Sequence, residues 1–146
     1  MARTLDGAKR VINGTYGEVW LDGEKVAECT ACQAKVELTK EAIHLCGRLM
    51  EDTKLTSAKG SGSLTLMKVD SGLGQKLSGL LDGVDRRFTV IEKLRDPDSY
   101  GAERVALYGV SFDDLTLADW ESAKQGSVTA PFTFTKYEYL DMIDAE

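Results

Sequence analysis

The chain has 146 residues, of which 42% are hydrophobic and 29% are charged, and both values are ordinary for one globular domain. Its 18 basic and 24 acidic residues give a formal net charge of −6. This argues against a general DNA- or RNA-binding surface, because such a surface needs clustered Lys and Arg. No apolar run approaches the roughly 18 residues of a membrane helix, and we expect no signal peptide. We therefore expect a single domain over residues 1–146, made in a cytoplasm and without a membrane partner.

The first predicted elements are an arm and a hairpin. Residues 1–15 are polar with a basic bias and are predicted to form an N-terminal arm. Asp22-Gly23 then stands between two runs that contain apolar residues, which is a strong signal for a two-residue hairpin loop. The pairs expected across this loop are Leu21–Glu24, Trp20–Lys25 and Val19–Val26.

A long loop is predicted after this hairpin. The alternation of apolar and polar residues breaks down near Thr39, and segment 39–59 mixes charges of both signs with scattered apolar residues. Loops of this length are uncommon unless they are functional. The Gly60-Ser61-Gly62 run that follows is expected to be a flexible turn or bulge, and strand character resumes from about Gly62 to Val69.

One amphipathic helix is predicted over residues 70–82. Its leucines recur at i, i+4, i+7 and i+8 and therefore form one apolar stripe. Asp70 or Ser71 can cap its start, and Gly83 can end it. The four leucines are Leu73, Leu77, Leu80 and Leu81.

The rest of the chain alternates again and predicts strands over residues 87–94, 103–117 and 127–139. A turn is expected at residues 96–101, where Asp, Pro, Ser and Gly gather. About six strands and one helix predict a mainly β fold, a sandwich or barrel with a helix packed on one side. Several strands are partly apolar on both faces, which suggests that neighbouring subunits cover the second face.

Three cysteines and one histidine form the most suggestive group. Cys29, Cys32, His44 and Cys46 lie within 18 residues and offer four soft ligands for a zinc ion. The spacing is unusual, and residues three apart on a strand point to opposite faces. Three cysteines are also too few for a disulfide framework. We therefore expect small, partly buried cysteines and a loop histidine rather than a metal site, with a zinc-binding β-barrel module kept as the alternative function.

No catalytic arrangement is predicted. Asp113 and Asp114 are adjacent, so on a strand their carboxylates face opposite ways. His44 is the only histidine, and no Ser or Cys has a clear base beside it. We expect no catalytic, cofactor-binding or metal-binding residues, and no enzymatic activity.

Taken together and in order, these segments resemble the tail tube proteins of contractile-tailed phages, in the branch that includes PBSX-type defective prophages. The resemblance spans about residues 10–140, and the order and spacing of the segments are more specific than any single one. The segments that carry it are Ile12–Gly14, Gly17–Glu24, Gly47–Met50, Gly60–Thr65, Glu103–Val110 and Ala130–Phe134.

The resemblance implies a structural protein of the virion, made in the cytoplasm of a bacterial host. Members of this family fold as a sandwich or barrel flanked by a helix, and they assemble into hexameric rings that stack into a tube. DNA passes through that tube without specific binding. The other implied partners are the tail sheath protein, the baseplate or tail initiator, and the tape measure protein.

The resemblance also implies that the long loop makes contacts between subunits, together with the N-terminal arm. The loop residues expected at those contacts are Glu41, Ile43, Leu45, Gly47, Arg48, Leu49 and Met50. No internal catalytic or cofactor site accompanies them in the family.

Overall fold

The structure is a computed structural model that describes residues 7–144. Its strands are β1 (Gly17–Leu21), β2 (Glu24–Lys25), β3 (Cys29–Ile43), β4 (Asp52–Met67), β5 (Phe88–Leu94), β6 (Glu103–Phe112), β7 (Ser127–Phe134) and β8 (Lys136–Asp141). Its helical segments are η1 (Ala8–Arg10), η2 (Gly14–Tyr16), α1 (Gly72–Lys76) and η3 (Leu80–Asp82). The prediction of a mainly β fold is therefore confirmed, with short helical segments in place of one longer helix.

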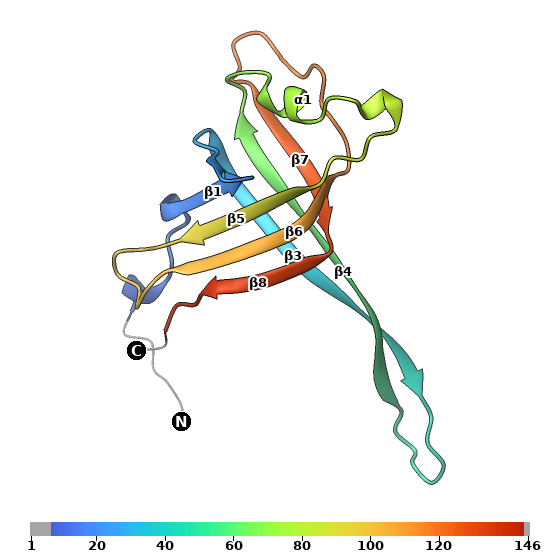
Figure 1. The fold of residues 1–146 in the computed structure, drawn as a ribbon. Helices are drawn as coiled ribbons and strands as arrows, with labels where there is room; N and C mark the ends of the chain where they lie inside the picture. The colour runs from blue at the N-terminus through green and yellow to red at the C-terminus, as the bar shows by residue number, and fades with distance from the viewer. Residues whose placement is uncertain (1–6, 145–146) are drawn as a thin grey trace.

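All strand pairs are antiparallel, in the order β2-β1-β5-β6-β7-β4-β3, and β8 also pairs with β6. The strands form two layers, which cross in Figure 1. The first layer contains β1, β2, β5, β8 and most of β6, and the second contains β3, β4 and β7. The last residues of β6 pair with β7 and join the layers.

The core lies between these two layers. The first layer contributes Val19, Leu21, Phe88, Val90, Leu107 and Val110, and the second contributes Leu64, Phe132 and Phe134. Phe112 connects Phe88 to Phe132 through edge-to-face contacts, with ring centroids 5.5 Å and 6.1 Å apart. Because these residues alternate along their strands, one face of each layer is apolar.

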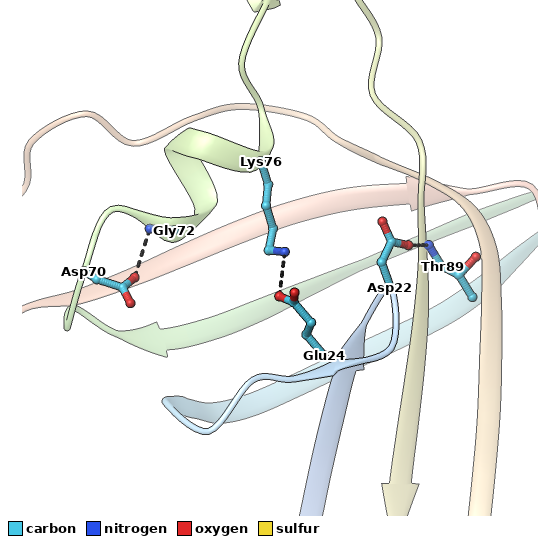
Figure 2. A network of polar contacts seen from close by, with 6 residues as sticks. All are labelled: Asp22, Glu24, Asp70, Gly72, Lys76 and Thr89. Carbon is cyan, nitrogen blue, oxygen red and sulfur yellow. Dashed lines mark hydrogen bonds and ion pairs between the residues drawn. The ribbon is translucent and has the colours of Figure 1, made fainter.

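The predicted first hairpin is confirmed in its register. Trp20 pairs with Lys25 and Leu21 with Glu24, and the Val26 amide donates to the Val19 carbonyl at 2.8 Å. Asp22 and Gly23 have φ values of 50° and 84°, which is the left-handed pair that a type I′ turn requires. The turn is also anchored to its neighbours, because the Asp22 carboxylate accepts from the Thr89 amide (Figure 2).

The predicted helix over 70–82 is wrong in its length. The α-helix covers only Gly72–Lys76, and a separate 3₁₀ turn follows at Leu80–Asp82. Gly79 lies between them in the left-handed conformation, with φ of 85°, at the start of the 3₁₀ turn, and a left-handed residue cannot continue a right-handed helix. Of the four leucines, Leu77 is buried and Leu73 partly buried, whereas Leu80 and Leu81 are exposed.

Side chains still fix the position of this short helix. The Asp70 carboxylate accepts from the Gly72 amide at 2.9 Å, as expected for a residue at the start of a helix. Lys76 at its other end pairs with Glu24 at 3.1 Å, which ties the helix to the first hairpin (Figure 2).

The strand expected over 127–139 is divided at Thr135 into β7 and β8, and the strand expected over 103–117 ends at Phe112. The break between β7 and β8 lies next to Gly109 of β6. Gly109 has φ of 65° and lies against the Thr135 side chain, and the Thr135 amide donates to the Tyr108 carbonyl at 3.0 Å. At this corner the chain leaves the second layer and enters the first.

The N-terminal segment is described from residue 7 onward, and the first six residues of the predicted N-terminal arm (residues 1–15) lie outside the described part. Residues 7–16 follow the chain's own surface rather than extending away from it. The Arg10 guanidinium stacks on the Tyr100 ring, 3.5 Å from its centroid. The backbone amide of Asn13 donates to the buried Asp96 carboxylate at 2.9 Å.

Candidate functional site

The most conspicuous feature of the surface is a long β-hairpin that leaves the sandwich (Figure 1). β3 and β4 pair from Cys29–Leu66 out to Ile43–Asp52. Every residue from 33 to 59 is exposed. We call residues 37–59 the arm. At about 3.3 Å per residue, its strands extend roughly 20 Å from the edge of the core.

The arm corrects the prediction of a long loop over 39–59. Residues 39–43 belong to β3 and residues 52–59 to β4, so only residues 44–51 form a loop. The alternation is hard to detect in the sequence because β4 carries one extra residue at this level. Thr39 pairs with Ser57 and Lys40 with Leu55, and this bulge shifts the phase of β4 by one position.

The two faces of the arm differ in chemistry. Alternation along β3 and the register with β4 place most of the apolar side chains, though not Ile43, on one face. The larger ones, Val36, Leu38 and Leu55, are 39%, 56% and 52% exposed. The apolar face carries Val36, Leu38, Ala42, Leu55 and Ala58 together with Lys40 and Thr53, and the polar face carries Glu37, Thr39, Glu41, Lys54, Ser57 and Lys59 together with Ile43 and Asp52.

The seven residues predicted for contacts between subunits divide between the strand and the loop. Glu41 and Ile43 lie in β3, on the polar face of the arm. The other five lie in the loop that we call the tip, residues 44–51. Gly47 has φ of 80°, and the Arg48 amide donates to the Leu45 carbonyl at 3.2 Å, so the tip is a tight turn. Leu49 and Met50 are almost completely exposed on it.

A groove of about 470 Å³ opens between the two layers at the root of the arm. Its floor and one wall are apolar and aromatic, and Val36 belongs both to the groove and to the apolar face of the arm. The second layer contributes Cys32, Ala34, Val36 and Phe134 to the lining, and the first layer contributes Glu92, Glu103, Val105, Leu107, Tyr137 and Tyr139.

The sequence pattern does not predict this groove. A single strand over 127–139 places Tyr137 on the face opposite Phe134, away from the core. The break at Thr135 reverses that phase, so that Tyr137 and Tyr139 turn toward the same opening as Phe134. Their rings meet edge to face with centroids 6.3 Å apart. In the sequence, only the apolar residues on both faces of several strands point to an apolar surface outside the core.

Two carboxylates lie in this groove, whose mainly apolar lining also includes Gln33 and Lys35. Partial burial raises the pKa of Glu92 to about 7, and the neighbouring Glu103 contributes a smaller part of the same shift. Neither carboxylate has an ion-pair partner within residues 7–144. At neutral pH the groove is therefore acidic but incompletely ionised.

Because the pKa of Glu92 is raised on folding, its protonated form stabilises the fold below about pH 4.5, and this contribution is lost as the pH rises through about 7. We expect Glu92→Gln to be more stable than the wild type at pH 8, by about 1 kcal/mol because water still screens the half-exposed carboxylate. The difference should vanish near pH 4.5. Thermal unfolding of dilute protein across this range measures it, with Glu41→Gln as the control on the exposed arm. A pH-independent difference would contradict this explanation.

The four candidate zinc ligands do not meet. A bulge at Thr30 lets both Cys29 and Cys32 pack against the core. Burial raises the pKa of Cys29, and it raises that of Cys32 to about 12, so both are poor metal ligands or nucleophiles at neutral pH. His44 and Cys46 lie at the tip, roughly 35 Å along the strand from Cys32. In the described part of the chain, no three His, Cys, Asp or Glu residues are grouped to hold a metal ion.

Exposed apolar side chains also lie outside the arm. The stretch between β6 and β7 is irregular, and Leu117 and Trp120 are exposed on it. Asp113 and Asp114, considered above as paired acids, lie at its start and are exposed, with no groove around them. Residues 7–144 contain no helix with the length and apolar character needed to cross a membrane.

Comparison with known proteins agrees with this geometry. The family model described as "Phage tail tube protein" matches residues 5–141. The chain is 34% identical over 134 residues to the phage-like element PBSX protein XkdM of Bacillus subtilis (strain 168), covering 90% of this chain and 91% of that protein. It is 35% identical over 142 residues to YqbM of the same organism, covering 93% and 95%.

Solved structures share the fold at low sequence identity. The sheath-tube complex of the extracellular contractile injection system PVC, in its extended state, contains a chain with a TM-score of 0.71 at 6% identity. The alignment covers 97% of this chain and 100% of that one. The tube-terminating cap of the anti-feeding prophage gives a TM-score of 0.70 at 8% identity, covering 97% and 95%.

The resemblance inferred from the residues is thus confirmed by a family model that covers nearly the whole chain and by a PBSX relative of equal length. The two-layer β fold agrees with it independently. The protein belongs to the phage tail tube protein family.

Proposed function

We propose that this protein is the structural subunit of the tube of a contractile-type tail, and that it acts through assembly rather than catalysis. The observation that carries the proposal is the arm. Its mainly apolar face extends about 20 Å beyond the core, and nothing in residues 7–144 covers it. A monomer rarely exposes such a continuous apolar surface unless another protein covers it.

The proposed assembly is a hexameric ring, and rings stack into a hollow tube. The subunit has two different exposed surfaces, the arm and the groove at the root of the arm, that could contact neighbouring subunits. Contacts between two different surfaces generate rings or open stacks rather than closed dimers. The pairing of strands across subunits would also protect the exposed edges of β2 and β3, which end the strand order.

The same proposal accounts for the polar face of the arm. Glu37 lies opposite Lys59 and Glu41 opposite Lys54, so charges of opposite sign alternate on it. Together with the net charge of −6, such a face would not retain DNA phosphates, since tight binding needs an excess of basic residues. We propose that DNA passes along a channel lined by this polar face without specific binding.

The further proposed partners are the tail sheath, the baseplate or tail initiator, and the tape measure protein. Support comes from the titles of the solved structures with this fold, which describe a sheath-tube complex and a tube-terminating cap. We propose that subunits are made in the cytoplasm of a bacterial host and end in the virion or tail particle.

Electron microscopy of the concentrated protein, with light scattering on the same sample, tests this function. We expect hollow tubes or rings with six-fold end views. A matched variant replaces Ala42–Thr53 by Asn-Gly, which joins the paired Glu41 and Lys54 by a two-residue turn. This variant should still fold, because the core lies outside the removed residues. It should remain monomeric, because the removed residues include the tip and the outer part of the arm.

Two outcomes would contradict the proposal. One is wild-type protein that stays monomeric at every concentration, including when it is mixed with its sheath protein. The other is a shortened arm that leaves tube formation unchanged. Tubes with another rotational symmetry would support the tube function but contradict the hexameric ring.

A further inference from the structure

The groove at the root of the arm has a specific chemical character. It combines an aromatic and aliphatic lining with two carboxylates, Glu92 and Glu103, that have no cationic partner in the described part of the chain. Lys35 also lies at its rim, but its ammonium group pairs with Glu37 at 3.2 Å. An apolar segment that carries one positive charge would suit such a groove, because it would bury the tyrosines and neutralise the acids together.

The tip of the arm has the complementary character. Leu49 and Met50 are almost fully exposed, and Leu45 is 44% exposed. Arg48 stands among them, and within residues 7–144 no carboxylate lies within ion-pair distance of it. The other basic residue of the tip, His44, faces Glu51 at 3.6 Å. The tip therefore offers one arginine within an apolar cluster.

The tip cannot reach the groove of its own chain. The groove lies beside residues 32–36 of β3, and the tip begins at residue 44, so about 25 Å of paired strand separates them. The paired strands hold the tip away from the sandwich (Figure 1). Contact between the tip and a groove must therefore join two copies of the chain.

We propose that the tip of the arm in one subunit docks into the groove of a second subunit, with Arg48 between Glu92 and Glu103 and with Leu49 and Met50 against Tyr137 and Tyr139. The proposal rests on the proposed tube function and specifies which surface receives the arm. The contact joins two different surfaces, so it repeats head to tail. Successive subunits along it are displaced by about the length of the arm.

Charge reversal at both partners tests this contact. Arg48→Glu and Glu103→Arg should each raise the protein concentration needed for assembly by about tenfold or more, as expected when a partly buried pair becomes repulsive. The double variant should return to within about threefold of the wild type. Lys54→Glu, on the polar face of the same arm, is the matched control and should change assembly little.

Disulfide trapping gives an independent readout, because Cys46 lies on the tip and is exposed. Tyr139→Cys places a second thiol in the groove. Under mild oxidation we expect covalent dimers and longer ladders on non-reducing gels, absent when Cys46→Ser is added. Lys124→Cys, on the irregular segment between β6 and β7, should give no ladder.

The outcomes separate this contact from the tube itself. Tubes that form without a ladder, and that tolerate both charge reversals, would overturn the docking site and leave the tube function standing. A ladder without tubes would support the docking site and overturn the tube. Neither tubes nor a ladder in concentrated wild-type and Tyr139→Cys protein would overturn both.

Discussion

Replacing Gly62 by alanine should destabilise the folded subunit by about 3 kcal/mol, the largest expected effect of any single methyl group added to this chain. Gly62 lies in the middle of β4, opposite Ala34 of β3 and Phe132 of β7. A Cβ atom there would overlap the Gln33 carbonyl oxygen and lie 2.8 Å from Cζ of Phe132 and 3.0 Å from Cα of Ala34. Two of these obstacles are backbone atoms in a paired strand, so the clash can be relieved only by moving β3.

Gly60 provides the matched control. A Cβ atom at Gly60 would lie 2.5 Å from the Phe134 ring, but the nearest atoms all belong to that side chain. Phe134 borders the open groove, so its ring can move toward that space, whereas a strand backbone cannot move alone. We expect Gly60→Ala to cost only about 1 kcal/mol, since alanine also lowers the entropy of the unfolded chain. Urea unfolding of the two variants measures the difference, and equal losses would contradict this account of β4.

These two glycines show why part of the fold is not visible in the sequence. Gly60-Ser61-Gly62 has the composition of a turn and was expected to be one, yet it lies inside a strand. At Gly62 the backbone obstacles belong to Gln33 and Ala34, almost 30 positions earlier in the chain. At Gly60 the nearest atoms belong to the Phe134 ring, which lies some 70 positions later. Local composition carries no information about such a distant partner.

The elements that the sequence predicts well are those fixed by local chemistry. The first hairpin depends on Asp22-Gly23, because few dipeptides adopt two successive left-handed residues. The alternating strands at 88–94 and 103–112 depend on side chains that alternate into one core. In both cases the determining residues are close in sequence, so the pattern and the structure agree.

The helix and the loop were mispredicted for different reasons. The leucine stripe at 73–81 has the period of a helix, but Gly79 interrupts it in the left-handed conformation, and a count of apolar positions ignores such a break. The prediction of a loop in place of the arm has two causes: Lys40 and Ile43 break the alternation in β3, and the bulge at Thr56 shifts β4 by one residue. That this segment makes contacts between subunits stays a prediction, which rests on the resemblance to tail tube proteins.

Of the candidate site, the tip was predicted and the groove was not. Residues Leu45–Met50 are contiguous, so a resemblance to a family could place them. The groove combines Glu92, Glu103, Tyr137 and Tyr139 from three strands. The groove exists only because the chain passes from the second layer to the first at Thr135, which lies next to Gly109 of β6. Only the three-dimensional structure brings these residues together.

Leu38→Asp should prevent tube assembly without unfolding the subunit. Leu38 is 56% exposed and lies beyond the core, so the isolated chain loses little when it becomes polar. In the proposed tube the apolar face of the arm is covered by another subunit, and the aspartate would be buried there without a partner. Burying an unpaired carboxylate costs several kcal/mol, which should raise the concentration needed for assembly by about 100-fold or more.

The adjacent residue on the same strand makes the test specific to one face. Thr39 points to the polar face of the arm, which the proposed function places in the water-filled channel. Thr39→Asp introduces the same charge one residue away and should change the assembly concentration by less than about threefold, because the carboxylate stays hydrated. Pelleting assays over a concentration series, with electron microscopy of the pellets, compare the two variants. If both assemble like the wild type, the apolar face of the arm is not buried in the tube; if both fail, the two faces of the arm are not distinguished by the assembly.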